Sequence, residues 1–263
     1  MFDVVLSGAG FEPFKHWPIW RFLLEGAWLS VRIAFFAITL SIVIGTAMAV
    51  LRLAPARPLR WIGATYIEVF RATPLLLLLF FIFFGAGRID LTFIRDVPLL
   101  KSLVDDRGHL DRIPAAVAAL TLYNSAVVAE IIRAGILSIS SGILEATRAL
   151  GLTYMQSMRY VALPMALRRM APGLVSQLIT LFKDTSLASI LSIFELLRSA
   201  RLLYDSPVYS NPLEVLLVVA MMYFIPCYAL SLLANKLAQS PDEERVVIVD
   251  AGAGPTTITA TTA

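Results

Sequence analysis

The sequence predicts an all-α integral membrane protein with five transmembrane helices and an additional N-terminal interfacial helix. Its 263 residues are 58% hydrophobic, with a mean hydropathy of +0.78. Only 16% of them are charged, whereas ordinary soluble domains carry about 25% charged residues. The chain also contains five apolar runs, each long enough to cross the hydrocarbon core of a bilayer. Helices are expected for these runs because lipid offers the backbone no hydrogen-bond partners.

One transmembrane domain is expected over residues 17–238, followed by a tail. The tail, residues 239–263, is charged at first and then rich in Gly and Thr, a composition typical of disorder. The five predicted spans cover residues 33–51, 61–86, 113–137, 169–193 and 213–235.

The N-terminal interfacial helix is predicted over residues 17–32. Trp17, Trp20 and Trp28 lie on an apolar stripe with helical spacing, and tryptophan is favoured at the depth of the lipid headgroups. The uncharged first span follows directly. No signal peptide is expected, because the first residues are not basic and no small-residue cleavage site follows an early apolar core.

The second predicted span contains two charged residues and a helix-breaking pair. Glu68 and Arg71 are three residues apart, so we expect them to face each other on one helix. Thr73 precedes a proline. Ionisable residues inside a membrane indicate a functional site by default, and a structural ion pair that braces the bundle is the alternative.

The third predicted span contains Asn124 near its middle and Glu130 nearer its end. Both are candidates for a solute path. A lone asparagine in a membrane helix also serves simply to hydrogen-bond a neighbouring helix.

The fourth predicted span is the most polar of the five. Lipid-facing positions do not tolerate its polar residues, which we therefore expect to face protein or a water-filled cavity; they are Gln177, Lys183, Asp184, Thr185 and Ser186. Lys183 and Asp184 lie about 100° apart on a helix, so at least one of them needs a partner elsewhere. We expect that partner to be Arg71, Glu68 or Asn124. The two charges either contact solute or hold a subunit interface together.

The stretch between the third and fourth spans, EATRALGLTYMQSMRYVALP at 145–164, is amphipathic and basic. We predict a short helix, a turn and the start of a second helix. The expected boundary signals are an N-cap at Ser141 or Gly142, Glu145 in the first turn, Gly151 at C′, a Thr153–Gln156 capping box, and a helix end or kink at Pro164. Local physics alone is equally compatible with a plain loop between two membrane helices.

The spacing within this stretch resembles the EAA loop of the permeases of ATP-binding-cassette (ABC) importers. That loop reads Glu-Ala-Ala, then Gly four residues later, then Ile-x-Leu-Pro after nine more. The chain matches it at Glu145, Ala146, Gly151, Leu163 and Pro164, and departs from it with Thr147 for Ala and Val161 for Ile. Three further blocks, at 70–81, 129–139 and 181–191, resemble the polar amino-acid branch of these permeases. The resemblance covers roughly residues 20 to 237.

The resemblance implies a transport subunit rather than an enzyme. The loop would be a coupling helix on the cytoplasmic side, docking on the ATPase through Glu145, Ala146, Thr147, Gly151, Leu163 and Pro164. The implied partners are an ABC ATPase dimer, a second permease subunit, identical or paralogous, and a solute-binding receptor. The solute would be a polar amino acid, and the segment 192–205 looks closest to glutamate/aspartate permeases.

ATP and Mg²⁺ would be bound by the ATPase, because this chain has no G-x-x-x-x-G-K-[ST] sequence and no cofactor is expected in it. The resemblance places the chain in the bacterial cytoplasmic (inner) membrane, with the N-terminus outside and the C-terminus in the cytoplasm. The positive-inside rule does not decide this orientation, because Lys and Arg are evenly divided between the two sides.

Two other classes of protein fit the sequence less well. A secondary transporter or channel would require inverted repeats or paired broken helices, which the sequence does not show. An intramembrane enzyme would require a nucleophile–base or metal set, yet no His lies in any predicted span. His16, His109 and the single Cys227 form no metal-binding pattern. The net charge of +3, without a basic run, also argues against nucleic acid as a partner.

Overall fold

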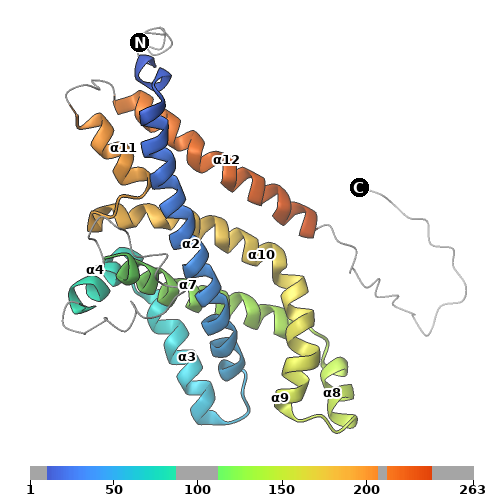
Figure 1. Cartoon of the computed structure of the whole chain (residues 1–263). Coiled ribbons are helices and arrows are strands. Elements are labelled where there is room, and N and C mark those ends of the chain that lie inside the picture. Colours follow the sequence, from blue (N-terminus) through green and yellow to red (C-terminus); the bar gives the residue numbers. More distant parts are fainter. Residues whose placement is uncertain (1–10, 87–111, 207–211, 239–263) are drawn as a thin grey trace, which may run out of the picture.

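The computed structural model describes residues 11–86, 112–206 and 212–238 (Figure 1). All regular structure in these ranges is helical, and the predicted tail 239–263 lies outside them. The α-helices are α2 (Trp17–Arg52), α3 (Arg57–Ala72), α4 (Leu75–Ala86), α7 (Arg112–Leu137), α8 (Ser141–Ala149), α9 (Tyr154–Ser157), α10 (Leu163–Asp184), α11 (Leu196–Tyr204) and α12 (Pro212–Ala238). Short 3₁₀ segments cover Glu12–Lys15 and Thr185–Leu191, and a π-helical turn covers Met158–Ala162.

Four helical stretches in the described ranges are long and apolar enough to cross a membrane. They are Trp17–Arg52, Arg112–Leu137, Tyr154–Leu191 and Pro212–Ala238. A fifth crossing exists only if α3 and α4, which are bent by 104° relative to each other, count as one broken span. The protein is therefore an all-helical integral membrane protein, in which one of the five expected spans is not a straight helix.

Helix α2 runs without interruption through the expected interfacial helix and the first span. Residues 17–32 are helical, as predicted, and continue into the first span without a break, since Pro18 lies in the first turn and Gly26 does not interrupt the helix. The 36 residues of α2 extend about 54 Å, well beyond the roughly 30 Å hydrocarbon core. Trp17 and Trp28 are 68% and 62% exposed, so the tryptophan face points away from the protein interior.

The expected second span breaks at Thr73–Pro74. Pro74 has no N–H to donate, and it also disfavours helical dihedrals in the residue before it. Thr73 accordingly has extended backbone, with φ −83° and ψ 128°. Its N–H and its hydroxyl both donate to the carbonyl of Val69, at 3.1 and 2.8 Å. The predicted span over 61–86 is thus divided into two helices at the helix-breaking pair Thr73–Pro74.

Helix α7 is the centre of the larger core. It packs against α2, α3, α4 and α10, and its most extensive contact is with α2. The approach of α2 is close at Gly45, where an added Cβ would lie 2.7 Å from the carbonyl oxygen of Ser125. The observed bounds of α7 agree with the predicted third span to within one residue at its start.

A second, smaller core joins the N-terminal half of α2 to α11 and α12. Figure 1 shows these three helices together near the end of α2 marked N. The buried apolar residues of this core are Ile19, Leu23, Leu196, Ala200, Val215 and Val219.

Candidate functional site

The turn between α8 and α9 is fixed by a glycine in the left-handed conformation. Gly151 has φ +78°, the region in which glycine is least strained. Its N–H donates to the carbonyl of Arg148 at 2.9 Å, and the N–H of Leu152 donates to the carbonyl of Thr147 at 3.1 Å. These two bonds form a Schellman motif. The prediction that Gly151 occupies the C′ position is confirmed.

The start of α8 differs from the prediction. The N-cap is Ser140, one residue before the expected Ser141 or Gly142, and its side chain makes no capping hydrogen bond. Glu145 is therefore the fifth helical residue and lies in the second turn, so the expected placement in the first turn is wrong. Its carboxylate consequently lies beyond the free amides that carry the positive end of the helix dipole.

The second helix of the stretch begins as predicted. The N–H of Gln156 donates to the hydroxyl of Thr153 at 3.4 Å, and the N–H of Thr153 donates to the Gln156 side chain at 2.8 Å. This reciprocal pair is a capping box, as its spacing indicated. The helix does not end at Pro164. It continues through the π-turn into α10, because the wider turn accommodates a residue that has no N–H to donate.

The side chains that match the EAA loop divide into two groups. Glu145, Ala146, Gly151 and Pro164 are exposed to solvent, whereas Leu163 packs against the large core.

Thr147, like Leu163, faces the protein interior, since it is only 5% exposed. Its hydroxyl donates to the carbonyl of Leu144 and accepts from the hydroxyl of Ser157, both at 2.8 Å. Thr147 thus braces α8 against α9. The pair is held to the rest of the bundle by the hydroxyl of Tyr154, which donates to the carbonyl of Val50 in α2 at 3.1 Å.

An ion cluster joins α2, α3 and α7. Arg52 contacts the carboxylate of Glu68 at 3.1 Å and that of Glu130 at 3.2 Å, and Glu130 also binds Arg133 at 2.5 Å. The expected Glu68–Arg71 pair is therefore wrong. Arg52, at the end of α2, takes Glu68 from a neighbouring helix, a pairing that spacing along one helix does not reveal.

The middle of the α7–α10 contact is polar. The side-chain amide of Gln177 donates to the Asn124 oxygen at 2.5 Å, and the Asn124 amide donates to the carbonyl of Leu120 at 2.8 Å. Asn124 is fully buried. The interpretation of Asn124 as a hydrogen-bonding link to a neighbouring helix is confirmed.

The charges at the end of α10 do not find the partners expected for them. Lys183 is exposed and Asp184 is half-buried, and neither forms an ion pair or a hydrogen bond with another residue that the structure describes. Glu68 and Asn124 are already paired with Arg52 and Gln177, so the expectation that Arg71, Glu68 or Asn124 would pair with them is wrong for a single chain.

The two residues that follow these charges belong to the 3₁₀ segment after α10. Thr185 is buried and donates to the carbonyl of Phe182 at 2.7 Å, while Ser186 is half-buried. Their hydroxyls therefore lie at the boundary between the end of α10 and the loop that leads to α11.

The residues predicted to line the solute path do not form one site. They lie at three heights along the axes of α7 and α10. The contacts of α7 with α10 pair Ser138 with Arg169 and Asn124 with Gln177, which makes the two helices antiparallel. Glu130 is six residues beyond Asn124 toward α8, and Lys183 is six residues beyond Gln177 in the opposite direction. At 1.5 Å per residue, each lies about 9 Å from the central amide pair.

A buried carboxylate that sequence reasoning missed lies in the smaller core. Glu195 is fully buried and caps α11, accepting from the N–H groups of Leu197 at 2.9 Å and Arg198 at 2.7 Å. It also accepts from the hydroxyls of Tyr223 at 2.9 Å and Ser30 at 3.4 Å. Burial raises the pKa of Glu195 to about 7, although these hydrogen bonds oppose the shift. The sequence does contain a signal for this cap: an acidic residue that directly precedes an amphipathic helical run.

No group of three or more His, Cys, Asp or Glu residues is arranged to hold a metal ion within 11–86, 112–206 and 212–238.

The described residues thus combine several apolar crossings with polar contacts between α7 and α10 and a capped helical turn at one end of the bundle. The family model described as "Binding-protein-dependent transport system inner membrane component" matches residues 41–241. The chain belongs to this family of ABC transporter permeases. It is thus a transport component of the inner membrane rather than an enzyme, and ATP hydrolysis in this family is carried by a separate subunit.

Amino-acid permeases are among its relatives. The chain is 38% identical over 217 residues to the probable glutamine ABC transporter permease protein GlnP of Bacillus subtilis, covering 82% of this chain and 92% of that protein. It is 36% identical over 221 residues to the glutamate/aspartate import permease protein GltK of Escherichia coli, covering 84% and 93%. A solved amino acid ABC transporter with histidines matches with a TM-score of 0.70 and 28% identity, over 89% of this chain and 99% of that one.

Proposed function

We propose that this chain carries a polar amino acid across the bacterial cytoplasmic membrane and that the α8–α9 turn docks on the ATPase. The observation that carries the proposal is the exposed, doubly capped turn at one end of the bundle. Its exposed positions, Glu145, Ala146 and Gly151, are those that match the EAA loop, and Thr147 holds them in place from the inside.

The orientation proposed here places α8 and α9 in the cytoplasm, with the N-terminus outside and the C-terminus inside. The resemblance to the permeases of ABC importers supports this orientation, since Lys and Arg are evenly divided between the two sides. Several exposed cations lie around the α8–α9 end of the bundle. They are Arg57, Arg60, Arg148, Arg159, Arg168 and Arg169.

The partners proposed are an ABC ATPase dimer that binds ATP and Mg²⁺, a second permease subunit and a solute-binding receptor. This chain itself would hold no cofactor. Lys183 forms no ion pair with a residue in the described ranges, which supports a second subunit: an exposed ammonium at the end of a membrane helix gains by meeting a counter-charge on another chain or on solute.

Glutamate or aspartate is the solute proposed for the first assay. The resemblance of 192–205 to glutamate/aspartate permeases supports this choice, while the relatives named above are assigned to glutamine and to glutamate/aspartate. Binding of a panel of amino acids to the partner receptor, measured by calorimetry, tests it. Tight binding of glutamine alone would replace glutamate and aspartate in the proposal.

The docking role of the turn is tested with Gly151→Asp in the assembled transporter. The variant acquires a Cβ in the left-handed conformation, at a local cost of about 1 kcal/mol, and a charge on the exposed surface. We expect ATP-driven uptake to be lost while the protein still inserts in the membrane, as measured by transport of labelled solute into proteoliposomes.

Gly142→Asp is the matched control. It adds the same carboxylate near the exposed start of α8, the helix that precedes the Gly151 turn, at a position with open space and no positive φ. We expect it to retain most of the uptake. Normal uptake by Gly151→Asp would refute the docking role.

The solute path is tested with Lys183→Met, with Lys236→Met in exposed α12 as the control. If Lys183 contacts solute, receptor-stimulated ATP hydrolysis should persist while transport falls or its selectivity changes. If Lys183 holds the subunit interface, the complex should dissociate at a lower temperature. A stable complex with unchanged uptake and selectivity would contradict both roles.

A further inference from the structure

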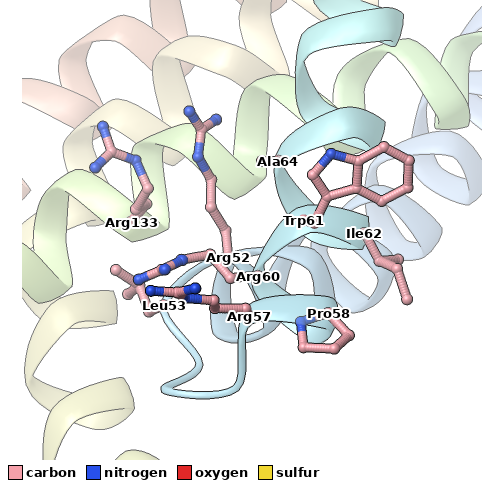
Figure 2. Close-up of a pocket in the computed structure, with 9 residues that line it drawn as sticks. All are labelled: Arg52, Leu53, Arg57, Pro58, Arg60, Trp61, Ile62, Ala64 and Arg133. Atoms are coloured by element: carbon pink, nitrogen blue, oxygen red, sulfur yellow. The ribbon is translucent and has the colours of Figure 1, made fainter.

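A hollow of about 840 Å³ lies beside the turn from α2 to α3 and reaches Arg52 and Arg133 of the ion cluster. Its lining combines four arginines with apolar side chains (Figure 2). The arginines are Arg52, Arg57, Arg60 and Arg133, and the other lining residues are Leu53, Pro58, Trp61, Ile62 and Ala64.

The charge of this hollow is not balanced. Arg52 and Arg133 are neutralised by Glu68 and Glu130 in the ion cluster. Arg57 and Arg60 form no ion pair or hydrogen bond with any residue in the described part of the chain. The hollow therefore carries two cations in excess, and planar guanidinium groups are well suited to bind the oxygens of a phosphate.

The wall facing the arginines is apolar and open. Figure 2 shows the arginine side chains gathered on one side, with Trp61, Ile62 and Pro58 on the other. Trp61 is 70% exposed and Ile62 is 50% exposed. A free phosphate would contact only the arginines and would leave this wall in water. A ligand with an anionic head and an apolar body would contact both sides.

The hollow also lies at a membrane boundary. It adjoins the end of α2, whose Val50 carbonyl accepts from Tyr154 of α9, so it shares one end of the bundle with the α8–α9 turn. An exposed tryptophan beside a basic turn is typical of the headgroup layer. In the orientation proposed above this end is cytoplasmic, and basic pockets between membrane helices near the cytoplasmic face bind anionic lipid headgroups.

We propose that this hollow binds the headgroup of an anionic phospholipid. Arg57 and Arg60 bind the phosphate, and Trp61 and Ile62 lie along the glycerol and the first part of the acyl chains. The site depends on the position of the chain in a membrane and not on which solute it carries. Bound lipid offsets the repulsion among the arginines and holds the α2–α3 turn against α7.

The test uses the purified full-length protein in detergent and three probes: phosphatidylglycerol, phosphatidylcholine and inorganic phosphate. Native mass spectrometry measures retained lipid, and thermal denaturation measures stabilisation. We expect phosphatidylglycerol to be retained and to raise the melting temperature, with little effect from phosphatidylcholine. Inorganic phosphate at equal concentration should not stabilise the protein.

The variant Arg57→Gln/Arg60→Gln removes the two excess cations and should weaken phosphatidylglycerol retention by about tenfold to thirtyfold, at about 1 kcal/mol per arginine. Arg148→Gln/Arg159→Gln removes two exposed cations from the same end but outside the hollow, and should retain lipid like the wild type. Trp61→Ala should also weaken retention.

Three outcomes would overturn the proposal. Equal retention of phosphatidylglycerol and phosphatidylcholine would show that headgroup charge is not recognised. Equal loss in the two double variants would assign the effect to overall charge. Stabilisation by inorganic phosphate equal to that by lipid would indicate a site for a free anion instead.

Discussion

Helices α7 and α12 are nearly equal in length, with 26 and 27 residues, yet they occupy opposite environments. The most apolar stretch of α7 is 67% buried inside the protein, while that of α12 is only 17% buried. The more apolar helix, α12, is thus the more exposed one. In a membrane protein, the helices that face lipid have the highest hydropathy. Helices surrounded by other helices contain more small and polar residues.

The residues of the two helices show the same contrast in detail. Thr121, Asn124 and Ser125 are buried along α7, among alanines that allow neighbouring helices to come close. In α12 the charged residues lie near its ends, at Glu214 and Lys236. Close packing of small residues is a main source of helix association in membranes. Substitutions at the contacts of α7 should therefore cost much more than substitutions on the exposed face of α12.

The largest effect is expected where α2 meets α7. In Gly45→Val the new Cβ would lie 2.7 Å from the Ser125 carbonyl oxygen and 2.9 Å from a methyl carbon of Val128. Backbone cannot yield as a flexible side chain does, so the helices must separate, at a cost of about 3 kcal/mol or more. We expect most of the protein to be lost from the monodisperse peak in size-exclusion chromatography. Ala220→Val, at an exposed position of α12, should elute like the wild type. An equal loss of monodisperse protein in Gly45→Val and Ala220→Val would refute the expected difference between the contacts of α7 and the exposed face of α12.

The next effect concerns the hydrogen bond that the Tyr223 hydroxyl of α12 donates to the Glu195 carboxylate at 2.9 Å. Because the folded-state pKa of Glu195 is raised from 4.5 to about 7, its neutral form stabilises the fold. That stabilisation is complete below pH 4.5 and is lost as the pH rises through 7, amounting to about 3 kcal/mol at most.

Thermal denaturation between pH 5 and pH 8 checks this prediction. The melting temperature should fall as the pH rises, and Glu195→Gln should flatten the dependence, whereas Glu145→Gln on exposed α8 should leave it unchanged. A pH dependence identical in wild type and Glu195→Gln would show that the carboxyl does not titrate in this range.

The smallest effect is expected for the amide pair of Asn124 and Gln177. Hydrogen bonds between membrane helices contribute little on average, because the polar groups also find partners in the unfolded state. A double-mutant cycle with Asn124→Leu and Gln177→Leu should give a coupling energy of about 0.6 kcal/mol. A value above about 2 kcal/mol would make polar bonding, rather than small-residue packing, the main reason for the stability of α7.

Some elements could be predicted because the signal lies within a few residues. Gly151 and the Thr153–Gln156 capping box are local features, and both are confirmed. Prolines were harder to interpret: Pro74 marks a 104° bend, whereas Pro164 stays inside a helix that widens into a π-turn before it. Which of these responses occurs depends on the packing of the flanking segments, and a single sequence does not contain that information.

The ion and amide partners were the least predictable part of the site. The residues themselves were recognised as polar groups inside apolar runs, but Arg52 takes Glu68 and Gln177 takes Asn124 from other helices. Pairing across helices depends on the rotation of each helix about its axis. Apolar periodicity fixes that rotation poorly in a membrane, where both the lipid and the protein interior are apolar.

The unbroken length of α2 has a mechanical consequence. Near one end, its Val50 carbonyl is bound to Tyr154 beside the proposed ATPase-docking turn, and in its other half Ser30 contacts the capping carboxylate of α11. Because α2 is continuous between these two contacts, we expect a displacement of α9 to reach α11 as a tilt of α2. Over about 54 Å, a tilt of only 10° about the centre displaces each end by about 5 Å. In the same tilt Ser30, which lies about 7 Å from the centre of α2, would move by about 1 Å.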